Sequence, residues 1–74
     1  MKDACMRDLV CWINKNVEVG DQMIGYKLLA EQVGYDDLTI RERMAKLGCL
    51  GVVSIIPGKR TVLLKDPLSE EEHF

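Results

Sequence analysis

Lys59 and Arg60 form a pair of adjacent cations within the stretch VVSIIPGKRTVLL. Pro57 and Gly58 precede the pair and apolar residues lie on both sides, a pattern that predicts a β-hairpin with a cationic turn. Residues 38–65 as a whole hold six basic residues and one acidic residue, although the chain has a net charge of −2. A local excess of positive charge attracts anionic partners. We therefore expect this turn to contact a polyanion.

Catalytic and metal-binding chemistry is not indicated by the residue types. Cys5, Cys11 and Cys49 are odd in number and lack CxxC spacing, which argues against a disulfide framework and a zinc site. A Cys–His nucleophile would need His73, which lies next to the C-terminus, to be held rigidly. The sequence also lacks a phosphate-cradling loop and a paired-carboxylate site. We predict that the protein is not an enzyme and binds no metal ion or cofactor.

The length and composition are those of one small soluble domain. The chain has 74 residues, of which 47% are hydrophobic and 30% are charged. No apolar stretch approaches the roughly 18 residues of a membrane span. Charged residues interrupt the N-terminal stretch, so it does not read as a signal peptide. We expect a cytoplasmic protein that does not associate with a membrane.

Three helices are predicted before the hairpin. The first covers residues 3–16, where Asp3 can cap the start and apolar residues recur at helical spacing. The second is the run YKLLAEQV, with Gly34 as its C-terminal stop. The third is the run LTIRERMAKLGCLG, for which Asp36 or Asp37 is the N-cap. The expected core residues of the helices are Cys5, Met6, Leu9, Val10, Ile13, Leu29, Ala30, Val33, Ile40, Met44 and Leu47.

The hairpin is predicted to pair residues 52–56 with residues 61–65, and Met23 and Ile24 could add a short strand. Two short helices joined by a tight turn predict a helix-turn-helix, and a hairpin directly after them predicts a wing. The fold class is therefore α+β, a winged helix-turn-helix of three helices with a C-terminal β-hairpin wing. We expect this domain to span residues 1–67 and to be followed by an acidic tail, residues 68–74.

The stretch from Tyr26 to Leu63 resembles the winged-helix DNA-binding domain of the GntR family of bacterial repressors. The likeness is carried by "KLLAEQVG", "TIRERMAKL" and "GVVSIIPGKRT", in this order and spacing, and covers about half of the chain. The resemblance implies a transcriptional regulator that binds double-stranded DNA. The large effector-binding domain that follows in the family is absent from this sequence, so no small-molecule effector domain is expected.

The resemblance also implies roles for single residues. Lys27 stands where a basic residue of the family contacts a phosphate, and Thr39 and Arg41 match the "T-[VI]-R" of the recognition helix. Pro57, Gly58 and Lys59 match the wing tip that enters the minor groove. The predicted DNA-binding residues are Lys27, Thr39, Arg41, Arg43, Lys46, Gly58, Lys59 and Arg60.

Elementary chemistry supports the same assignments. Arg41 in a major groove could donate two parallel hydrogen bonds to guanine, whereas Arg43 and Lys46 suit phosphates. The cations of the wing tip suit the negative potential of a narrow minor groove. The alternative is a solvated helix face with local ion pairs, and a hairpin tip that is polar because it is exposed.

Two features leave a second function open. Asp36 and Asp37 occupy the place where the family has a Ser-Arg or Thr-Arg pair, at the end of the recognition helix that would meet DNA. The hairpin is apolar on both faces, so a partner could cover one of them. The alternative is a protein–protein interaction module that docks on a transcription or replication protein. The second apolar face also favours a homodimer, with a slightly apolar monomer as the other possibility.

Overall fold

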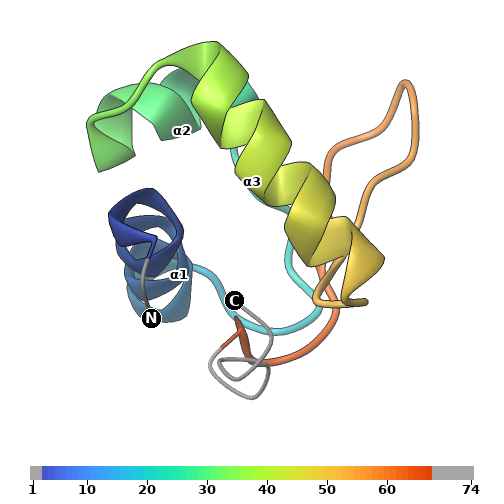
Figure 1. Ribbon diagram of the computed structural model, residues 1–74. Coiled ribbons are helices and arrows are strands. Elements are labelled where there is room, and N and C mark those ends of the chain that lie inside the picture. The colour runs from blue at the N-terminus through green and yellow to red at the C-terminus, as the bar shows by residue number, and fades with distance from the viewer. Residues whose placement is uncertain (1–2, 68–74) are drawn as a thin grey trace.

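The computed structural model describes residues 3–67, which form three helices and a two-stranded sheet (Figure 1). The elements are α1 (Ala4–Asn16), α2 (Tyr26–Val33), α3 (Asp37–Cys49), β1 (Val53–Ser54) and β2 (Val62–Leu63). This order confirms the predicted sequence of helices and hairpin. The predicted acidic tail and His73 lie outside the described residues. Among the described helices, none combines the length and the apolar character that crossing a membrane requires.

Helix α1 forms because its apolar residues recur on one face and Asp3 caps its start. The Asp3 carboxylate accepts a hydrogen bond from the Met6 N–H at 3.1 Å, which satisfies one of the free donors at the N-terminus. The predicted apolar stripe is confirmed, since all five of its residues are buried: Cys5, Met6, Leu9, Val10 and Ile13.

Helices α2 and α3 are joined by the tight turn that the sequence predicts. Gly34 ends α2 in the left-handed conformation, with φ of 92°, and its N–H donates to the Ala30 carbonyl. Asp36, rather than Asp37, is the N-cap of α3. The inner face of α3 buries Ile40, Met44 and Leu47 against α1 and α2, as predicted.

The left-handed backbone of Gly34 gives a first testable prediction. An alanine side chain in this conformation costs about 1–2 kcal/mol, so Gly34→Ala should lower the free energy of unfolding by that amount. Urea unfolding followed by circular dichroism measures the change. Gly34→Asn is the matched comparison, because asparagine tolerates the left-handed conformation better than alanine and should lose less stability. Equal losses in the two variants would contradict the explanation.

The hairpin is shorter than predicted. Its antiparallel ladder pairs Val53 with Leu63 and Ser54 with Val62, and the predicted pairing does not extend to residues 55–56. The physical reason is that the turn begins early: the Lys59 N–H donates to the Ile56 carbonyl, so Ile56 belongs to the turn and not to the ladder. The other edge of β2 is bonded to the segment before α2. The Met23 N–H donates to the Thr61 carbonyl at 2.8 Å, next to an isolated bridge between Gln22 and Val62. The strand expected at residues 23–24 does not form, and the bridge lies one residue earlier, at Gln22.

Beyond the ladder, residues 55–61 form an extended loop, which is drawn in orange in Figure 1. We call this loop the wing loop. It lies on the opposite side of α3 from α1 (Figure 1). The ladder at its base is anchored in the core, because Val52, Val53 and Leu63 are buried there.

Candidate nucleic-acid interface

An open groove of about 970 Å³ lies between the wing loop and the start of α2. Three basic residues line it, Lys27 from α2 and Lys59 and Arg60 from the wing loop, and all three are exposed. Glu31 is the one acidic residue among its lining. The fold thus brings cations that are more than thirty positions apart in the chain to one concave surface. We call this surface the basic groove.

A tight turn presents the cations of the wing loop. The Lys59 N–H donates to the Ile56 carbonyl at 3.0 Å, and Gly58 between them has φ of 80°. Proline followed by glycine with positive φ is the composition of a type II turn. The predicted turn therefore forms, but over residues 56–59, one residue earlier than the expected 57–60. The Arg60 guanidinium also donates a weak hydrogen bond of 3.5 Å to the Met23 carbonyl.

Arg41 lies at the edge of the basic groove. Its Cζ is 5.9 Å from the ring centroid of Tyr26, which lines the groove. Its Nε is 3.3 Å from the Asp37 carboxylate one turn earlier in α3. The side chain is nevertheless 61% exposed, so it is open to a ligand. An ion pair this exposed stabilises by well under 1 kcal/mol, so little free energy is lost when it is broken.

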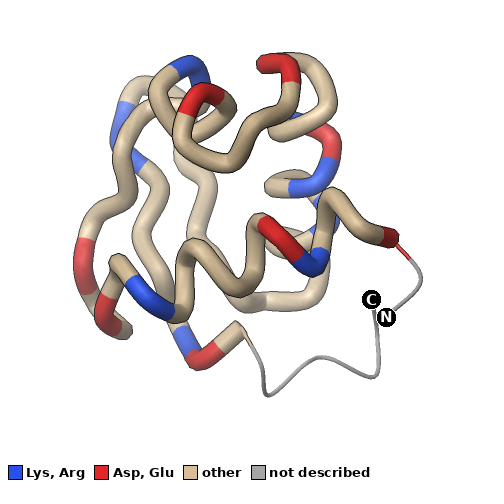
Figure 2. The backbone as a smooth tube through the Cα atoms, turned by 90° about the vertical axis from the view of Figure 1, so that its left-hand side faces the viewer, with Lys and Arg blue, Asp and Glu red and all other residues tan. Residues whose placement is uncertain are grey.

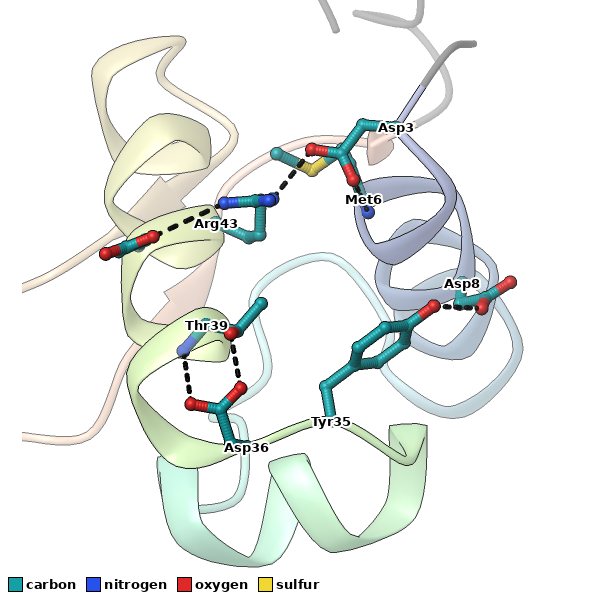
Figure 3. Close-up of polar contacts among 8 residues, drawn as sticks. Asp3, Met6, Asp8, Tyr35, Asp36, Thr39 and Arg43 are labelled. Atoms are coloured by element: carbon teal, nitrogen blue, oxygen red, sulfur yellow. Dashed lines mark hydrogen bonds and ion pairs between the residues drawn. The ribbon is translucent and has the colours of Figure 1, made fainter.

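Thr39 was expected to approach a ligand, but its polar groups are bonded within α3. Its N–H and its hydroxyl both donate to the Asp36 carboxylate, which is how Asp36 caps α3 (Figure 3). The hydroxyl bond from Thr39 is the main reason that the pKa of Asp36 is lowered, so this carboxylate stays ionised. The hydroxyl predicted to approach DNA is thus engaged within the first turn of its own helix.

Arg43 was predicted to neutralise a phosphate, but it faces the start of α1. Its Nε lies 2.7 Å from the Asp3 carboxylate, and its Nη1 lies 3.6 Å from that of Glu42 (Figure 3). The Asp3 contact is an ion pair without the alignment of a hydrogen bond. Only 29% of the Arg43 side chain is exposed. Because its charge is compensated by two carboxylates, we leave Arg43 out of the candidate interface.

The Asp3 contacts predict a pH effect on stability. The Met6 N–H, and after it the positive charge of Arg43, lower the pKa of Asp3 below its ordinary value of 3.8. The ionised carboxylate therefore stabilises the fold above pH 3.8, and this stabilisation is lost as the pH falls through the lower folded-state pKa. Between about pH 5 and pH 2, Asp3→Asn should lose less thermal stability than the unmodified chain. Glu18→Gln, in the exposed segment after α1, should lose as much thermal stability over this pH range as the unmodified chain.

Lys46 and the two aspartates complete the surface of α3. Lys46 is exposed in the last turn of the helix, as expected for a phosphate contact, and lies outside the basic groove. Asp36 and Asp37 are each paired within α3, with Thr39 and Arg41. Figure 2 shows basic and acidic positions on several sides of the backbone, so local convergence rather than net charge distinguishes the basic groove.

Sequence reasoning missed three residues of this surface: Tyr26, Thr61 and Asp37 as the partner of Arg41. The spacing of Asp37 and Arg41, four residues apart on one helix, was a usable signal for their ion pair. Tyr26 and Thr61 are 35 residues apart, and their contact depends on how the hairpin packs against α2. Local spacing carries no signal for such a contact.

Comparisons with known proteins were made by sequence and by structure. No family model matches this chain, and no curated protein matches it. Its structure is similar to that of a GntR family transcriptional regulator from Listeria monocytogenes, with a TM-score of 0.69. The alignment covers 96% of this chain and 67% of the other, at 20% sequence identity. The fold is a winged helix-turn-helix.

Within this winged helix-turn-helix, α2 and α3 form the helix-turn-helix and the hairpin of β1 and β2 carries the wing loop. The predicted fold class is therefore confirmed, including three helices and a C-terminal hairpin. The protein of similar fold belongs to the family that the sequence resembles. Helix α3 is the second helix of the helix-turn-helix, the position that the recognition helix takes in DNA-binding proteins with this motif.

Proposed function

We propose that this winged helix is a cytoplasmic transcriptional regulator that binds double-stranded DNA. The observation that carries the proposal is the convergence of Lys27, Lys59 and Arg60 on the basic groove, with Arg41 at its edge. The Listeria monocytogenes protein of similar fold is described as a transcriptional regulator, which supports the same function at a coarser level.

The proposed binding mode places α3 in the major groove and the wing loop over the adjacent minor groove or its phosphates. Arg41 is the base-reading residue, because a guanidinium can donate two parallel hydrogen bonds to guanine O6 and N7. Lys27, Lys46, Lys59 and Arg60 contact phosphates, which supply affinity without sequence preference. Gly58 shapes the tip of the wing loop by its positive φ.

Asp36 and Asp37 are compatible with this mode because both carboxylates have partners in α3. Asp36 accepts hydrogen bonds from Thr39, and it lies at the positive end of the helix dipole. Asp37 pairs with the Arg41 Nε, so it can orient the guanidinium rather than repel a phosphate. This arrangement favours DNA over the protein–protein interaction module that the sequence left as an alternative.

Salt dependence of duplex binding tests the proposal. Four phosphate contacts should give a slope of about −3.6 in a plot of log K against log salt concentration. Fluorescence anisotropy with a 20-base-pair duplex of mixed sequence, between 50 and 300 mM salt, measures the slope. A protein-docking module would bind no duplex under these conditions. Sedimentation of the free and the bound protein tests, in the same samples, the homodimer that the apolar hairpin favours.

A further inference from the structure

Tyr26 occupies the junction of the three parts of the proposed interface. It is the first residue of α2, directly before Lys27, and its side chain is partly buried along the basic groove. One end of this side chain reaches the recognition helix and the other end reaches the base of the wing loop. None of the roles assigned above to the cations includes this tyrosine.

The ring of Tyr26 contacts the recognition helix. The Arg41 guanidinium carbon lies 5.9 Å from the ring centroid, within the range of a cation–π contact. Arg41 has a long side chain with many rotamers, and 61% of it is exposed. The ring on one side and the Asp37 carboxylate on another limit the rotamers that Arg41 can adopt. An arginine held in this way loses less conformational entropy on binding a base.

The hydroxyl of Tyr26 contacts the wing loop. It lies 3.3 Å from the hydroxyl of Thr61. Thr61 is the last residue of the wing loop before β2. Thr61 is only 7% exposed, and its carbonyl accepts from the Met23 N–H. The ladder of the hairpin ends at Ser54 and Val62, and the bonds of Thr61 and Arg60 to Met23 tie the wing loop to the segment before α2. The tyrosine hydroxyl adds a contact between the wing loop and α2 itself.

We propose that Tyr26 is a positioning residue that fixes Arg41 and the wing loop relative to each other, so that base readout and phosphate contacts occur in one register on the duplex. This inference rests on the proposed function and extends it to sequence discrimination. The ring acts on Arg41, and the hydroxyl acts on the wing loop. The two effects can be separated by substitution, because phenylalanine keeps the ring and leucine removes it.

Binding measurements on two variants test the inference. A preferred duplex is first selected from random sequences with the unmodified protein, and a scrambled duplex is the reference. Tyr26→Leu should reduce the ratio of the two affinities about fivefold, the equivalent of an exposed cation–π contact. Adding Tyr26→Leu to Arg41→Ala should reduce it no further. Tyr26→Phe should weaken binding to both duplexes about threefold and leave their ratio unchanged.

Tyr35→Phe is the matched control, because the Tyr35 hydroxyl donates to Asp8 on α1 at 2.9 Å, away from the basic groove (Figure 3). It should change neither the affinities nor their ratio. Full discrimination in Tyr26→Leu, or additive losses with Arg41→Ala, would overturn the inference while DNA binding itself stood.

A measurement without DNA separates the inference from the proposed function. In NMR spectra the Arg41 side-chain protons should show a ring-current shift that Tyr26→Phe retains and Tyr26→Leu abolishes. Absence of this shift from the unmodified protein would show that Tyr26 does not position Arg41. If the shift is present but no duplex is bound, the proposed function fails and the contact between Tyr26 and Arg41 stands.

Discussion

The double charge reversal Lys59→Glu, Arg60→Glu is expected to weaken duplex binding by about two orders of magnitude at 0.1 M salt. Each phosphate contact contributes close to one counterion to the binding equilibrium, so losing two contacts reduces the binding constant about 60-fold. The introduced carboxylates add repulsion to this loss. The salt slope should fall by about 1.8 at the same time.

A control variant with the same change in net charge makes this result specific. Arg7→Glu, Lys15→Glu places both reversals on exposed positions of α1, which lies on the other side of α3 from the wing loop (Figure 1). Because salt screens the interaction between distant charges, this control should keep nearly the salt slope of the unmodified protein. Equal losses in the two double variants would show that net charge, rather than the basic groove, determines affinity.

The second large effect concerns the core that supports the recognition helix. Leu47 is fully buried in α3, so Leu47→Ala should lower the free energy of unfolding by about 2–5 kcal/mol. A domain of this size has a total stability of only about 4–11 kcal/mol. The variant should therefore lose about 10 °C or more in Tm, measured by circular dichroism.

Leu38 supplies the matched control for this substitution. It is a leucine on the same helix, but 66% of it is exposed. Leu38→Ala should change the free energy of unfolding by no more than about 0.5 kcal/mol. A comparable loss in both variants would mean that burial in the core does not explain the effect.

The helices could be predicted because their information is local. The apolar stripe of α1 and the glycine that ends α2 follow from spacing and from backbone sterics alone. The choice between Asp36 and Asp37 as N-cap could not be made from sequence, because both residues satisfy the same preference. Hydrogen bonds with Thr39 decide it in favour of Asp36.

The candidate interface could be predicted only in part, because its residues meet through tertiary packing. The cations of the wing loop and Lys27 were identified singly, but the groove that unites them depends on how the hairpin lies against α2. Arg43 looks like its neighbours Arg41 and Lys46 in sequence. Its partner, Asp3, lies 40 residues away, and no local pattern indicates that pairing.

The brevity of the hairpin ladder has a consequence for proteolysis. Trypsin cleaves after lysine and arginine. It cleaves a folded protein most readily where the chain opens locally. Lys59 and Arg60 are exposed in a loop outside the ladder. The other described lysines and arginines lie within helices, except Lys65, which is partly buried. Within the described part of the chain, trypsin should therefore cleave first at the tip of the wing loop. Bound duplex should protect this site before any other.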